Sequence, residues 1–216
     1  MTTLSDVTTW TQKHVYSVGT NVVNLNVGYS SYTANIYSTE VISDWRNLNV
    51  LRVPVYLSGS ADNLDIGFID AADTATIAGG QVQFDGLTSF WGVRINIWND
   101  YIGTIAGGSV VSQLSYYQLP WNEVAWCSFI DVGGGNMSIG LVRADGGNLL
   151  GSWVVAAPSF TSCRVAMGVW SGGYGLSASI SNPIQIGNPF PTPAATRRWN
   201  PRRSYRNLQT RVRATR

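Results

Sequence analysis

Apolar and polar residues alternate with a period of two along much of this chain, and that alternation is the strongest constraint on its fold. It runs through 93–98, 137–141 and 165–169, where Val, Ile, Leu or Met occupies every second position. Successive side chains of a strand point to opposite faces of a sheet, so this period predicts half-buried antiparallel strands. Glycine pairs such as Gly79–Gly80 and Gly107–Gly108 separate the runs and suit tight turns, because glycine reaches positive φ without a steric cost. The pattern predicts an all-β fold of about eight to ten strands.

A single sandwich of two sheets accommodates these strands. The chain has 216 residues, of which 44% are hydrophobic and only 12% are charged, enough apolar surface for one sizeable core. We expect the sandwich to span 12–187, with 1–11 as an N-terminal arm. The N-terminus lacks the basic and apolar regions of a secretory signal, and no stretch approaches the roughly 18 apolar residues of a membrane span, so we expect a soluble protein.

One segment departs from the alternation. Val41, Ile42, Trp45 and Leu48 recur at positions i, i+1, i+4 and i+7, which is the spacing of an apolar helix face. We therefore expect one helix of about two turns here, after the first two strands of the sandwich.

The chain ends in a proline-rich spacer and an arginine-rich arm. The spacer, 188–196, has three prolines in alternate positions, which favour an extended polyproline-like conformation. The arm, 197–216, has no acidic residue, and we expect its arginines to contact nucleic acid or neighbouring subunits: Arg197, Arg198, Arg202, Arg203, Arg206, Arg211, Arg213 and Arg216. Its apolar residues are candidate anchors: Trp199, Tyr205 and Leu208.

Charge is distributed very unevenly between the body and the arm. The first 196 residues have six basic and twelve acidic side chains, a formal charge of −6, whereas the eight arginines give the arm +8. Guanidinium groups bind phosphates in a bidentate fork, so a polyanion such as RNA is one natural partner. The acidic body of a neighbouring copy is another, and a solvated tail that only aids solubility is a third reading.

Catalytic and metal-binding patterns are absent from the sequence. His14 is the only histidine and lies outside any nucleophile motif, and Cys127 and Cys163 are 36 positions apart, in apolar runs that favour buried free thiols. Aspartates between 62 and 85 match no calcium loop; we expect Asp73 in a turn and Asp65 facing solvent or neighbouring subunits. We expect no enzyme activity, no metal and no cofactor.

Tryptophans offer an alternative function. Trp91, Trp98, Trp121 and Trp126 could form a face on which sugar rings stack. Core packing uses the same residues, because large aromatic side chains in sandwiches are mostly buried.

The order of elements in this chain resembles that of the single jelly-roll coat proteins of small icosahedral picorna-like viruses. Strands are followed by a short helix at 41–48, then by further strands and a basic arm. The segment 116–121, Tyr-Tyr-Gln-Leu-Pro-Trp, is similar to a short aromatic-proline step before a late core strand. The resemblance covers 12–187 by pattern and implies an antiparallel jelly-roll sandwich of about eight strands, one short helix and an extended C-terminal arm. Many such proteins have their basic arm at the N-terminus, so this arm could face either side of a shell.

The leading hypothesis is accordingly a capsid subunit of a non-enveloped RNA virus. The resemblance implies assembly with other capsid subunits in the host cytoplasm, location in the virion, and an arm that contacts neighbours or packaged RNA. The alternative is a carbohydrate-binding, lectin-like sandwich with an aromatic sugar-stacking face. A jelly-roll glycosidase is a third possibility.

Overall fold

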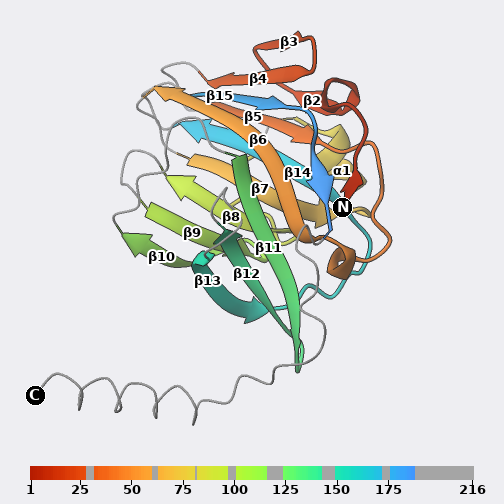
Figure 1. Ribbon diagram of the computed structural model, residues 1–216, viewed down its shortest axis with the longest axis vertical. Coiled ribbons are helices and arrows are strands. Elements are labelled where there is room, and N and C mark those ends of the chain that lie inside the picture. Colours follow the sequence, from red (N-terminus) through yellow and green to blue (C-terminus); the bar gives the residue numbers. More distant parts are fainter. Residues whose placement is uncertain are drawn as a thin grey trace, which may run out of the picture.

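Two antiparallel β-sheets packed face to face form the body of the protein (Figure 1). The computed structural model describes residues 1–27, 32–59, 63–80, 82–96, 101–115, 124–142, 149–171 and 176–187. The prediction of an all-β antiparallel sandwich of jelly-roll type is confirmed. The described residues form sixteen strands rather than eight to ten. Four of them have only two or three residues, too few positions to show a period, and the other twelve have six or more.

The first sheet has nine strands. Seven follow the order β13-β12-β11-β6-β15-β4-β3, while β16 pairs with β6, and β1 pairs with β16. Their bounds are β1 Thr2–Thr3, β3 Ser17–Gly19, β4 Val22–Val27, β6 Asn49–Gly59, β11 Val124–Gly133, β12 Asn136–Val142, β13 Leu149–Ala156, β15 Leu176–Ser181 and β16 Gln185–Ile186.

The second sheet has seven strands in the order β10-β9-β8-β7-β14-β5-β2. Their bounds are β2 Thr11–Lys13, β5 Tyr32–Tyr37, β7 Asn63–Asp70, β8 Phe90–Asn96, β9 Tyr101–Ala106, β10 Ser109–Ser115 and β14 Cys163–Ser171. Strands that are neighbours in space are often distant in sequence, as for β7 and β14.

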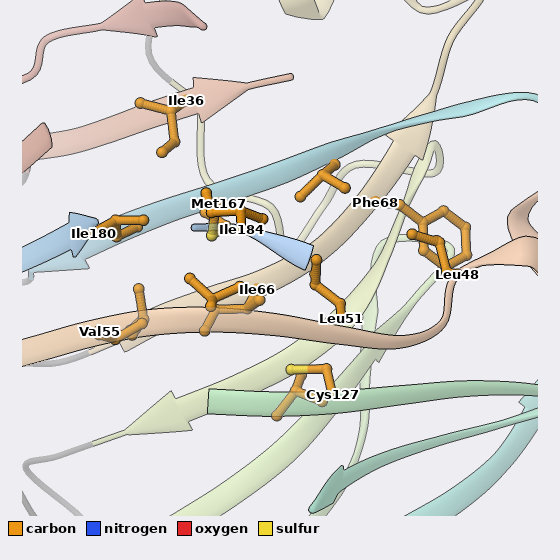
Figure 2. Packing of buried hydrophobic residues seen from close by; sticks show 14 of the residues in the cluster. Ile36, Leu48, Leu51, Val55, Ile66, Phe68, Cys127, Met167, Ile180 and Ile184 are labelled. Atoms are coloured by element: carbon orange, nitrogen blue, oxygen red, sulfur yellow. The ribbon is translucent and has the colours of Figure 1, made fainter. Parts of the chain in front are cut away.

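The main core lies between the two sheets. Figure 2 shows Ile66 and Met167 of the seven-stranded sheet lying among Leu51 and Val55 of β6. Cys127 is also there, and both cysteines are free and buried, as predicted. Burial raises the pKa of the Cys127 thiol to about 12.

The first eleven residues pack on the sandwich. Thr2 and Thr3 pair with β16, and the side chains of Leu4, Val7 and Trp10 are buried in the main core. Val7 begins a 3₁₀ turn, η1 (Val7–Thr9), which Asp6 caps by accepting a hydrogen bond from the Thr8 amide.

The helix expected at 41–48 is a single 3₁₀ turn, η2 (Trp45–Asn47), so the predicted length of about two turns is wrong. Ile42 instead exchanges both backbone hydrogen bonds with Cys163, in an isolated bridge to the first residue of β14. That bridge holds the backbone extended at 42, so the helix begins only after the Asp44 cap. The α-helix of the described residues, α1 (Thr74–Ala78), lies elsewhere, and Asp73, expected in a turn, is its N-cap. No helix in the described ranges has the length and apolar character needed to cross a membrane.

A second, smaller core lies on the outer face of the seven-stranded sheet. The cover segment, which we define as 71–80 and 82–89, packs Phe84, Val82 and Leu87 onto Phe90 and Ile105 of this face. Phe84 stacks on Phe90 with ring centroids 4.2 Å apart. This segment therefore gives one part of the outer face an apolar cover.

Candidate functional site

Polar side chains line up across the seven-stranded sheet beyond the cover segment. Residues directly opposite each other on antiparallel strands point to the same face, so the strand register defines rows of neighbouring side chains. The core-facing positions are Leu64, Ile66, Val93 and Ile95, which places the alternate positions of β7 and β8 on the outer face. Two consecutive rows of that face are polar.

The first row, which we name the Arg94 row, consists of Asn35, Gly168, Asp65, Arg94 and Gly103. Arg94 donates from Nε to Asp65 Oδ1 at 2.8 Å and from Nη2 to Asp65 Oδ2 at 2.7 Å, a bidentate pair. Both residues are 3% exposed, so the expectation that Asp65 faces solvent or a neighbouring subunit is wrong. The alternation of β7 places Asp65 on the outer face, but the fold covers that face.

The cover segment is tied to the Arg94 row at two points. Arg94 Nη2 also donates to Asp85 Oδ1 at 2.8 Å, and Asn35 Oδ1 accepts a hydrogen bond from the Val82 amide at 3.0 Å. Gly168 makes this approach possible, because a Cβ there would lie 2.3 Å from Asn35 Nδ2 and 2.9 Å from the Phe84 ring. The Arg94 row therefore anchors the cover segment and serves the structure of the face.

The two carboxylates of this row have opposite pKa shifts. Burial raises the pKa of Asp65, against the effect of its hydrogen bonds with Arg94. The hydrogen bond from Arg94 lowers the pKa of Asp85, whose side chain is 32% exposed and less penalised by burial. Asp85 therefore stays ionised to lower pH in the folded protein than in the unfolded chain.

We predict that the Asp85 pair makes folding sensitive to acid. A carboxyl group whose folded-state pKa is lowered binds its proton more readily when unfolded, so its contribution to stability is lost as the pH falls below the ordinary value of 3.8 and through the lower folded value. Urea denaturation between pH 5 and pH 2.5, in roughly half-unit steps, should show a shallower loss of the free energy of unfolding in Asp85→Asn than in the wild type. Equal slopes would show that the folded-state pKa of Asp85 is not lowered.

The second row, which we name the asparagine row, consists of Thr33, Trp170, Asn63, Asn96 and Tyr101. Asn96 Nδ2 donates to Asn63 Oδ1 at 2.9 Å, and both asparagines are buried. Trp170 on β14 and Tyr101 on β9 flank this amide pair, and both aromatic side chains are half-buried. Trp170 Nε1 is shielded from solvent and has no acceptor among the described residues.

The asparagine row is the candidate functional site. It combines aromatic rings, which provide flat apolar surface, with amides, which donate and accept hydrogen bonds in a fixed plane. Leaving a shielded N–H without an acceptor costs about 1–3 kcal/mol, and the Trp170 indole shares this feature with the Trp45 indole and the Tyr37 hydroxyl of the packed cores.

Most residues proposed from the sequence lie outside the part of the chain that the structure describes. The whole arm lies outside the described residues: Arg197, Arg198, Arg202, Arg203, Arg206, Arg211, Arg213 and Arg216, with Trp199, Tyr205 and Leu208. Trp98 and Trp121 lie outside them as well. His14 is exposed directly after β2.

The other two tryptophans proposed for a sugar-stacking face are described, and neither lies on the outer face of the seven-stranded sheet. Trp91 is a core residue, 8% exposed, whose Nε1 donates to the Ala156 carbonyl at 3.1 Å. Trp126 is half-buried on the opposite side of the molecule, where the Arg52 guanidinium lies 5.7 Å from its ring centroid. Of the four tryptophans proposed for that face, the two that the structure describes therefore lie outside the asparagine row.

The sequence does contain a signal for the asparagine row. Asn63 and Asp65 alternate with Leu64 and Ile66, and Arg94 and Asn96 occupy the polar positions of the next such run, so both pairs belong to one face of a sheet. The pairing of β14 with β7, which brings in Trp170, joins positions about a hundred residues apart and has no local signal.

No group of three or more His, Cys, Asp or Glu side chains in the described ranges is arranged to hold a metal ion.

Comparison with known proteins identifies the fold and no family. No protein-family model and no curated protein sequence matches the chain. Among solved structures it is similar to a legume lectin-like domain from Entamoeba histolytica, with 10% identity and a TM-score of 0.55 over 82% of this chain and 88% of that one.

Two other solved structures have the same sandwich. A carbohydrate-binding module from Bacillus subtilis is 14% identical, with a TM-score of 0.50 over 81% of this chain and 92% of that one. A human SPRY domain is also 14% identical, with a TM-score of 0.50 over 77% of this chain and 95% of that one. None of these three is a viral coat protein. The chain therefore has a β-sandwich fold that also occurs in carbohydrate-binding modules, lectin-like domains and SPRY domains.

Proposed function

We propose that this protein is a carbohydrate-binding β-sandwich module whose site is the asparagine row. The observation that carries the proposal is the flanking of the hydrogen-bonded Asn63–Asn96 pair by Trp170 and Tyr101 on one face of the seven-stranded sheet. Sugars present apolar C–H faces edged with hydroxyl groups. Aromatic rings pack against the C–H faces, and amides form hydrogen bonds with the hydroxyl groups.

Trp170 contributes its aromatic ring to this row. The residue is half-buried, and the ring supplies apolar surface of the kind that packs against the C–H face of a sugar, whereas Nε1 is shielded from solvent.

We propose binding without hydrolysis. A glycosidase needs two carboxyl groups on either side of the scissile bond, one of them free to donate a proton. The carboxylates described beside the asparagine row are Asp65 and Asp85, and Arg94 binds both of them. In that arrangement they neutralise a cation and hold the cover segment.

The structural comparisons support the proposal only through the fold. The lectin-like domain and the carbohydrate-binding module show that such a sandwich accommodates sugar-binding proteins, and SPRY domains show that it serves other proteins too. The argument for sugar binding therefore rests on the side chains of the asparagine row.

Replacing Trp170 by alanine tests the proposal. We expect the wild-type protein to bind members of an immobilised panel of neutral oligosaccharides, and Trp170→Ala to bind at least about tenfold more weakly, since buried tryptophan contacts contribute 2 kcal/mol or more. Trp126→Ala is the matched control, because Trp126 is also half-buried but lies on the nine-stranded sheet. Circular dichroism would show that both variants are folded.

Two results would contradict the proposal. Equal losses of sugar affinity in Trp170→Ala and Trp126→Ala would show that both substitutions act by destabilising the fold. A wild-type protein that binds no sugar of the panel and elutes as a megadalton assembly in light scattering would support the capsid-subunit hypothesis instead.

A further inference from the structure

We infer that the arginine-rich arm, 197–216, binds single-stranded nucleic acid, with its guanidinium groups on the phosphates and its aromatic rings on the bases. This activity is separate from the proposed sugar binding, whose site is on the seven-stranded sheet. The inference comes from the charge of the arm and from the bonds that the carboxylates of the body already make.

The acidic groups of the body are a poor match for the arm. Eight of the twelve acidic residues lie in the part of the chain that the structure describes, and Arg46 and Arg94 bind four of these eight in ion pairs. The other four accept hydrogen bonds from backbone amides or hydroxyl groups: Asp6, Glu40, Asp70 and Asp73. Four scattered carboxylates face eight clustered arginines, and isolated surface ion pairs contribute little to binding.

The sheet from which the arm departs does not attract it either. The described chain ends at Gly187, whose amide donates to carbonyls at the start of β6. The nine strands of this sheet contain one acidic residue, Asp131, which binds Arg46 at 2.8 Å, and one basic residue, Arg52. Arg52 is half-buried, donates to the Gln185 amide oxygen at 3.2 Å and forms no ion pair with a described carboxylate. The described strands therefore favour an anionic partner from outside the chain.

The spacing of charge in a nucleic-acid strand suits the arm better. A strand has one phosphate per nucleotide, so about eight nucleotides provide a partner for each of the eight arginines. Guanidinium groups bind phosphate oxygens in a bidentate fork. The nine residues of the spacer, 188–196, can span at most about 30 Å, which is enough for the arm to reach a strand beside the body.

Aromatic residues within the arm favour nucleic acid over other polyanions. Trp199 and Tyr205 lie among the arginines. Aromatic side chains stack on unpaired bases with little regard to sequence, and a sulfated polysaccharide has anionic groups but no aromatic face. A single strand, whose bases are accessible, therefore matches both residue types of the arm.

Fluorescence anisotropy of a labelled strand of twenty uridines, titrated with the full chain, tests this inference. If all eight arginines contact phosphates, the logarithm of the affinity falls against the logarithm of the salt concentration with a slope of about −5.6, or roughly 500-fold between 50 and 150 mM salt. Replacing these eight arginines by glutamine should weaken binding at least about hundredfold, and replacing them by lysine much less, because lysine keeps the charge. Arg46→Gln is the control, since two aspartates already bind Arg46, and should match the wild type.

A variant with both Trp199→Leu and Tyr205→Leu tests the contact with bases. We expect it to bind the uridine strand about tenfold more weakly than the wild type and a heparin fragment equally well, because only the strand offers bases for stacking. Wild-type affinity of this variant for the strand would show recognition of charge alone and would overturn the assignment to nucleic acid.

Two other results would refute the inference. One is binding of the strand that is insensitive to salt or unchanged in the eight-glutamine variant. The other is a wild-type protein that binds no strand but forms, in light scattering, assemblies that the eight-glutamine variant lacks. The arm would then bind the acidic bodies of neighbouring copies. Neither result bears on sugar binding, which Trp170→Ala tests separately.

Discussion

Replacing Arg94 by methionine should lower the free energy of unfolding by about 3–5 kcal/mol, which is the usual cost of breaking a buried ion pair from one side. The substitution removes a guanidinium that is 3% exposed and leaves Asp65, equally buried, without its two hydrogen bonds. It also removes the bond that ties Asp85 and the cover segment to the sheet. Urea denaturation followed by circular dichroism measures the loss.

Arg46 provides a matched control for this substitution. It also bridges two aspartates, Asp44 at 2.9 Å and Asp131 at 2.8 Å, but its side chain is 45% exposed. Ion pairs in contact with water contribute about 0–1 kcal/mol, so Arg46→Met should cost at most about 1 kcal/mol. Similar losses of the free energy of unfolding in Arg94→Met and Arg46→Met would show that burial does not determine how much the Arg94 pair stabilises the fold.

A double variant separates the ion pair from the packing around it. In Asp65→Leu with Arg94→Met, no carboxylate remains unpaired at position 65, and apolar pairs of similar volume often replace buried ion pairs at little cost. We expect most of the stability lost in Arg94→Met to return, which a double-mutant cycle would measure as a strong coupling. A double variant no more stable than Arg94→Met would show that the unpaired carboxylate at position 65 is not the source of the loss.

Truncating Phe68 to alanine should be comparably severe, with a loss of about 3–5 kcal/mol. Phe68 is fully buried and lies at the centre of an aromatic group, stacked on Trp45 at 6.3 Å and edge-on to Phe129 at 5.1 Å and Phe160 at 6.2 Å. The deletion leaves a cavity between the two sheets and removes three aromatic contacts, each worth about 0.5–1.5 kcal/mol beyond its buried area.

Two further variants calibrate the Phe68 result. Phe68→Leu keeps most of the volume and should cost less than half as much, because the cavity is smaller. Tyr56→Ala removes an aromatic side chain that is 50% exposed on the nine-stranded sheet and should have little effect. A loss in Phe68→Ala no larger than that in Tyr56→Ala would mean that the interior repacks around the missing ring.

The alternation in the sequence predicted the main strands correctly because burial on one face of a sheet imposes that period directly. Val93 and Ile95 face the core, as do Met137, Ile139 and Leu141. The helix at 41–48 was predicted too long because burial in the main core, and not one helix face, sets the spacing of its apolar residues. Ile42, Trp45 and Leu48 are all buried in that core, whereas Val41 is 51% exposed. The backbone bridge from Ile42 to Cys163 keeps the chain extended before the turn that begins at Trp45.

The candidate site was harder to predict, because it depends on which outer positions the fold covers. A polar residue at an outward position of a strand normally faces water, which is why Asp65 was expected at the surface. Its burial depends on the cover segment, which packs through Phe84 and binds Arg94 through Asp85. Trp170 reaches the asparagine row through a strand pairing that no local pattern specifies.

The ends of the described chain meet at the nine-stranded sheet, where β1 pairs with β16 and Gly187 donates to the Val50 carbonyl at 2.9 Å. The asparagine row is on the outer face of the other sheet. Tethering the protein to a bead or a sensor through residue 1 or residue 187 would therefore direct the asparagine row away from the support. The pairing of β1 with β16 also makes residues 1–187 a candidate for circular permutation, with residue 187 joined to residue 1 by a short linker and new ends opened in the exposed turn at Gly134–Gly135.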